Sequence, residues 1–102
     1  MIVTADSLTA MTDTECLKAV KISLNITGGY QDDNISQYIQ EAKNYLLSAG
    51  VNPAVIGSTL AIGCISRGVA DLWNYGNGDT KLSEYFFQRA DQLRMIEVTE
   101  DV

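Results

Sequence analysis

The residues able to do nucleophilic or metal chemistry are few in this 102-residue chain. It has two cysteines, Cys16 and Cys64, and no histidine. The absence of histidine removes the usual general base, the Cys–His and Ser–His pairs, and the commonest metal ligand. Two thiols far apart in the sequence cannot make a zinc site alone. Both lie within apolar helical patterns, so we expect two reduced, packed thiols of a cytosolic protein.

Paired carboxylates occur at Asp32 and Asp33, which could in principle bind a metal or act as an acid/base pair. No Asp-x-Asp-x-Asn-Gly calcium loop surrounds them, and they stand where a helix is expected to begin. We therefore interpret them as helix N-terminal residues that satisfy free backbone N–H groups. The glycine turns "TGGY" and "YGNGDT" lack the lysine and the strand–loop–helix context of a phosphate loop. We predict that the chain is not an enzyme and has no cofactor or metal.

Composition and charge narrow the class of partner. Apolar residues make up 46% and charged residues 20%, which is typical of a globular domain. A net charge of −6 argues against non-specific nucleic-acid binding, because phosphates must be met by clustered basic residues. We expect no signal peptide. We also expect no membrane span, because Gly50, Asn52 and Pro53 interrupt the uncharged stretch 44–66.

Hydrophobic periodicity predicts an all-α fold, a compact bundle of four helices over about 14–25, 33–48, 53–75 and 80–96. Asp13 is the expected N-cap of the first helix, Gly50 ends the second, and Asn52 with Pro53 starts the third. A flexible N-terminal arm (1–12) and an acidic C-terminal tail (97–102) flank this single domain (1–102). No strand is expected.

The expected helix 53–75 is apolar on nearly all sides in its first half, which is typical of a central helix. Three glycines, Gly57, Gly63 and Gly68, lower its helix propensity, and we expect them to allow a neighbour to approach closely.

Aromatic residues gather around the turn that follows this helix. Trp73 and Phe86 suit the core, but Phe87 falls outside the apolar stripe of its own helix, and Leu47 does so on 33–48. Off-stripe aromatic side chains are candidates for protein–protein contact. Arg67 and Asp71, four residues apart, can pair on one face. The predicted subunit interface comprises Leu47, Arg67, Asp71, Tyr75, Tyr85 and Phe87.

The order of a short helix, "ITGGYQDDNISQYIQEAKNYLLSAG", "ISRGVADLWNYG" and "YFFQR" resembles the phage head–tail connector family, also called adaptor or head-completion proteins. The resemblance covers about residues 14–95. It implies a viral structural protein of the virion assembly pathway, located at the head–tail interface and in the host cytoplasm during assembly.

The resemblance further implies a homo-oligomeric ring of about twelve subunits, stacked between the portal and the next head-completion or tail protein. Isolated subunits could then be monomeric. DNA would pass through the channel without sequence-specific binding, and an acidic lumen would let it slide. By family analogy the tail docks on the portal, through Met95, Ile96, Glu97, Val98 and Val102.

The sequence is also compatible with two other functional classes of protein. One is a small inhibitor or antitoxin-like module that uses its acidic surface to block a basic partner. The other is a helix-turn-helix DNA-binding regulator, whose recognition helix 33–48 would offer Lys43 as its one basic residue.

Overall fold

The helices begin at residues whose side chains complete the hydrogen bonding of the first turn. The computed structural model describes residues 1–75 and 82–99, with the backbone alone for 74 and 75. Helix α1 (Asp13–Leu24) starts with a capping box: the Thr12 hydroxyl accepts from the Glu15 N–H, and the Glu15 carboxylate accepts from the Thr12 N–H. The prediction that Asp13 is the N-cap is wrong by one residue.

Helix α2 (Asp32–Ser48) has almost the predicted bounds. Gly50 follows it with a φ of +97°, a left-handed conformation that favours glycine. Helix α5 (Glu84–Arg94) has Ser83 as its N-cap, and the Ser83 hydroxyl accepts from the Phe86 N–H. It is shorter than the predicted 80–96, and residues 80 and 81 lie outside the described residues. The mainly helical class is confirmed.

The predicted helix 53–75 is two helices. Helix α3 (Pro53–Ile56) starts at Asn52, whose side chain accepts from the Ala54 N–H, as predicted. Helix α4 (Ile62–Tyr75) begins six residues later. Between them the backbone bonds to the N-terminal segment: the Met11 N–H donates to the Gly57 carbonyl and the Thr59 N–H to the Thr9 carbonyl. These hydrogen bonds to the N-terminal segment take the place of the bonds that would continue the helix from α3 into α4.

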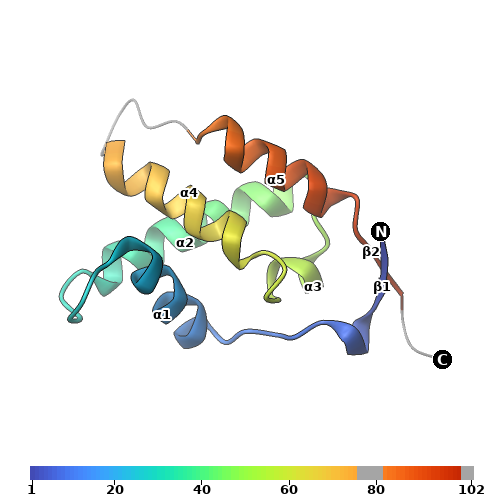
Figure 1. Ribbon diagram of the computed structural model, residues 1–102, viewed down its shortest axis with the longest axis horizontal. Coiled ribbons are helices and arrows are strands. Elements are labelled where there is room, and N and C mark those ends of the chain that lie inside the picture. The colour runs from blue at the N-terminus through green and yellow to red at the C-terminus, as the bar shows by residue number, and fades with distance from the viewer. Residues whose placement is uncertain (76–81, 100–102) are drawn as a thin grey trace.

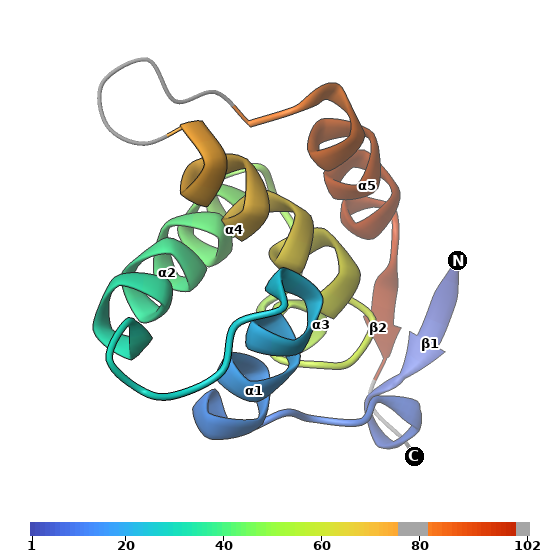
Figure 2. The same ribbon diagram turned by 60° about the vertical axis from the view of Figure 1, so that its left-hand side comes forward.

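Helix α4 is the central element, whereas the predicted central position applied to the whole of 53–75 and rested on its apolar first half, most of which lies before α4. It contacts α1, α2 and α5, and Figure 2 shows α4 between α1 on one side and α5 on the other. The core around it draws residues from every helix: Cys16, Val20, Ile35, Ile39, Ala42, Leu46, Val51, Val55, Ile56, Ala61, Cys64, Ile65, Val69, Phe86, Ala90 and Leu93.

At one of the three glycines a neighbouring helix lies so close to the backbone that no side chain would fit. A Cβ on Gly68 would stand 2.9 Å from Cε2 of Phe86 and 3.3 Å from Cβ of Ala42, so α5 packs directly on the α4 backbone there. A Cβ on Gly63 would meet nothing within 4 Å, and one on Gly57 would lie in ordinary contact. The expectation is therefore confirmed for Gly68 alone.

The two ends of the described chain are tied together. Strand β1 (Ile2–Thr4), followed by a short 3-10 turn η1 (Ala5–Ser7), pairs in parallel with strand β2 (Glu97–Thr99), with Val3 opposite Val98. Figure 1 shows the pair at one end of the molecule. The expectation of a free arm, a loose tail and no strand is wrong for residues 2–4 and 97–99. Each strand has only three residues, too few for an alternation of apolar and polar side chains to be recognised in the sequence.

We predict opposite effects for alanine at two glycines of α4. Gly68→Ala should lower the free energy of unfolding by about 1–3 kcal/mol, because the fully buried Phe86 ring has no room to retreat. The matched change Gly63→Ala should raise it by about 0.5–1 kcal/mol through helix propensity. Urea unfolding of both variants checks this. Equal effects would show that α5 does not rest on Gly68.

Candidate functional site

The two thiols are structural. Cys16 and Cys64 are free and buried, as predicted. Burial raises the pKa of the Cys64 thiol to about 11, and burial also raises the pKa of Cys16. Cys64 donates its S–H to the Phe86 carbonyl at 3.7 Å. A thiol held in this protonated form is a poor nucleophile.

The acidic pair sits at the start of α2 as expected, but α2 has no side-chain cap hydrogen bond, and Asp32 instead fixes the preceding loop. The Asp32 carboxylate lies 2.8 Å from Nζ of Lys21, which also donates to the Gly28 carbonyl. Asp33 is exposed in the same first turn. Within residues 1–75 and 82–99, no group of three or more acidic or cysteine side chains could hold a metal ion.

Phe87 has a partner within its own subunit, contrary to the sequence-based interpretation. Its ring centroid lies 5.4 Å from that of Tyr45 on α2 and 5.9 Å from that of Phe86. Even so, 39% of Phe87 stays exposed. The aromatic contact holds the ring in place and leaves one side of it to solvent.

Leu47 is 54% exposed and belongs to a different surface. It follows Tyr45 by two residues, about 200° around the helix. Lys43, one turn before Leu47 on the same face, has its Nζ 3.8 Å from the Asp13 carboxylate of α1. Leu47 thus lies on the α1 side of α2, whereas Tyr45 and Phe87 lie on the α5 side.

Arg67 and Asp71 form the predicted pair, with Nε of Arg67 3.3 Å from the carboxylate. The Asp71 side chain is only 3% exposed, and its other oxygen accepts from the Ser83 N–H at 2.9 Å. Asp71 therefore joins α4 to the N-cap of α5 inside the subunit. Arg67 is half exposed, and its guanidinium carbon lies 5.9 Å from the centroid of the exposed Tyr85 ring.

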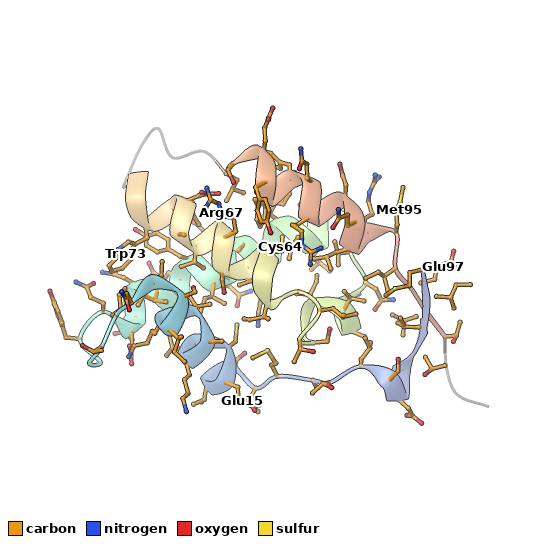
Figure 3. All side chains as sticks on the ribbon, in the orientation of Figure 1. Glu15, Cys64, Arg67, Trp73, Met95 and Glu97 are labelled. Atoms are coloured by element: carbon orange, nitrogen blue, oxygen red, sulfur yellow. The ribbon has the colours of Figure 1, made fainter. Side chains whose placement is uncertain are left out.

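The remaining interface candidate, Tyr75, has a side chain outside the described residues. Figure 3 shows Arg67 and Trp73 along α4 and Met95 with Glu97 at the far end. Trp73 packs edge-on against Tyr38, at 6.3 Å between ring centroids, and belongs to the margin of the core.

The predicted tail residues share a surface with the N-terminus. We call Met1, Ile2, Met95 and Ile96 the terminal patch. Met95 is 68% exposed, and Met1 and Ile2 are similarly exposed. A hollow of about 320 Å³ opens beside it, lined by Met1, Leu60, Arg89, Gln92, Leu93 and Ile96. Glu97 and Val98 lie in β2, and Val102 lies outside the described residues.

A second apolar surface, on α1, was missed by sequence reasoning. An open hollow of about 440 Å³ is lined by Thr14, Leu17, Lys18, Lys21, Ile22, Ile26, Thr27, Gly28 and Asp32, and we call it the α1 hollow. Ile22 is 69% exposed. The available signal was that Ile22 falls outside the stripe of Leu17, Val20 and Leu24, as Phe87 does on its own helix.

Comparison with known proteins gave no match to any protein-family model, any curated protein or any solved structure.

Among the helices that the structure describes, none combines the length and the apolar character needed to cross a membrane.

We predict that adjacent phenylalanines of α5 differ in their contribution to folding. Phe87→Ala should cost about 1–2 kcal/mol, because part of the ring is already in water and the Tyr45 contact is lost. Phe86→Ala, at a fully buried position, should cost about 3–5 kcal/mol. Thermal and urea unfolding measure both. A loss at Phe87 as large as that at Phe86 would show that Phe87 is a core residue.

We predict that Asp71 is needed for the start of α5. Asp71→Ala leaves the Ser83 N–H without its acceptor and should cost about 1–3 kcal/mol. Asp91→Ala breaks an exposed pair with Arg94 and should change stability by less than about 0.5 kcal/mol. Hydrogen exchange of the α5 amides should quicken in the first variant alone. Unchanged exchange would contradict the role of Asp71.

Proposed function

We propose that this chain is a structural virion-assembly protein, a head–tail connector that forms a ring between the portal and a tail or head-completion protein. The observation that supports this most is the placement of the exposed apolar side chains. They occur in several separate places: Ile22 on α1, Tyr30 between α1 and α2, Leu47 on α2, Tyr85 and Phe87 on α5, and the terminal patch at one end of the molecule. A protein with one partner needs one such surface.

A ring subunit stacked on another protein needs at least three surfaces. Two lateral surfaces meet the neighbours on either side, and they differ from each other because a ring closes through heterologous contacts. A third surface meets the next protein along the axis. The α1 hollow, the exposed side of Phe87 and the terminal patch can fill these roles, and large exposed apolar groups commonly mark protein–protein contacts.

The terminal patch suits attachment to the portal. It combines exposed Met95 and Ile2 with a hollow whose rim carries Arg89, which bonds to Gln92 and forms no ion pair with any described carboxylate. Across residues 1–75 and 82–99, each strand of the β1–β2 pair beside it has only the other strand as a partner, and an unpaired strand edge is a template for an added strand. A portal segment with an apolar residue and a carboxylate would fit this end.

The charge of −6 is consistent with a ring through which DNA passes. A negative lumen repels phosphates, so the duplex can slide without being held. The same acidity would also suit the competing class, an inhibitor that binds a basic partner, and the experiment below separates the two.

Electron microscopy of the chain mixed with purified portal tests the proposal. We expect an added ring of density on one face of the portal, of the same rotational symmetry or a related one. A portal without added density, together with a tight one-to-one complex with another protein, would favour the inhibitor class.

We predict that Met95→Glu abolishes portal attachment and leaves the free energy of unfolding within about 0.5 kcal/mol, because Met95 is largely in solvent. The control is Tyr30→Ser, at an exposed residue between α1 and α2, which should leave attachment unchanged. Co-sedimentation with portal measures attachment. Normal binding by Met95→Glu would exclude the terminal patch as the docking surface.

A further inference from the structure

We propose that copies of this chain associate head-to-tail, with Phe87 of one copy seated in the α1 hollow of the next. This inference rests on the proposed ring and names the two surfaces that would form its lateral contact. The Phe87 patch is defined as Tyr45 and Phe87 with the acidic residues around them, Glu41, Glu84 and Asp91.

The α1 hollow offers an apolar floor with a positive rim. Leu17 and Ile26 are partly buried against the core, and Ile22 stands out beside them with most of its surface in water. Lys21 on the rim is already paired with Asp32. Lys18 is exposed and forms no ion pair with any described residue, so the hollow has an unmatched positive charge.

The Phe87 patch has the opposite arrangement, an apolar projection among three carboxylates and one cation, Arg94, which follows Phe87 by seven residues on the same face of α5. Glu84 precedes Phe87 by three residues and Asp91 follows it by four, so both share its face of α5. Asp91 has a loose exposed pair with Arg94, at 3.6 Å. Glu41 lies one turn before Tyr45 on α2. Neither Glu84 nor Glu41 forms an ion pair within the described part of the chain.

The two surfaces are therefore complementary in shape and in charge. An aromatic ring held by Tyr45 would lose its remaining exposure in an apolar hollow, and such anchors contribute most of the energy of an interface. Lys18 would meet Glu84 or Glu41 at the edge. Pairs at an exposed edge add little affinity, but they set the orientation and exclude wrong pairings.

The two surfaces also lie on opposite sides of the molecule. Helices α1 and α5 flank α4, which contacts both, and Figures 1 and 2 show the two helices apart from each other. A contact between unlike surfaces on opposite sides leaves one of each surface free in a dimer. It must then repeat, giving a ring where the rotation closes.

Cysteine cross-linking tests this contact. Thr27, on the rim of the α1 hollow, and Gln88, beside Phe87, are both exposed, whereas the native thiols are buried. We would prepare Thr27→Cys, Gln88→Cys and the double variant at millimolar concentration and treat them with a short bismaleimide. Each single variant alone should stay monomeric, their mixture should give a dimer, and the double variant a ladder.

Dimers of one single variant with itself would show a two-fold contact and overturn the inference. So would the absence of cross-links in the mixture and in the double variant. Because no portal is present, this result is independent of the portal experiment. A ladder without portal binding would leave the head-to-tail contact standing and remove the connector function.

A charge exchange supplies a second measurement. Lys18→Glu or Glu84→Lys alone should reduce the cross-linking yield about tenfold, and the two changes in one chain should restore it. Asp6→Lys, at an exposed site in η1, is the control and should have little effect. Single variants that cross-link as well as the parent would exclude the proposed orientation.

Discussion

The packing of Phe86 against the backbone of α4 at Gly68 is the contact on which the rest of the bundle depends. The Phe86 ring is fully buried, lies against Gly68 and packs against Tyr45. The backbone carbonyl of Phe86 accepts a hydrogen bond from the Cys64 thiol. Asp71 then holds the Ser83 N-cap to α4. Together these contacts fix the position and the rotation of α5. Phe87 projects outward because its neighbour in sequence occupies the core.

The joined ends have a related consequence. Because β1 pairs with β2, the N-terminal residues and those after α5 form one surface, and Met1 and Ile2 become neighbours of Met95 and Ile96. A two-stranded pair of this length is marginal by itself. It is supported by the packing of Ile96 and Val98 against the core. A docking partner that added a strand would stabilise it further.

The candidate surfaces illustrate how far side-chain periodicity can be used. Phe87 and Leu47 were expected to be exposed because they fall outside the apolar stripes of their helices, and both are partly exposed. Periodicity gives a direction relative to one helix axis, however, and not the position of neighbouring helices. It therefore placed Leu47 and Phe87 together, although α2 separates them, and it placed buried Asp71 on the surface.

The sequence by itself determined the helical class, the N-cap at Asn52 and the stop at Gly50, because caps, turns and apolar periodicity are local properties. Only the tertiary structure decided the break after Ile56, the β1–β2 pair and the α1 hollow. The first two depend on contacts between segments far apart in the chain, Thr9 with Thr59 and Val3 with Val98, and the hollow depends on the loop that Lys21 holds against the start of α2. Such contacts leave no periodic signal, because their free energy comes from groups that the fold alone brings together.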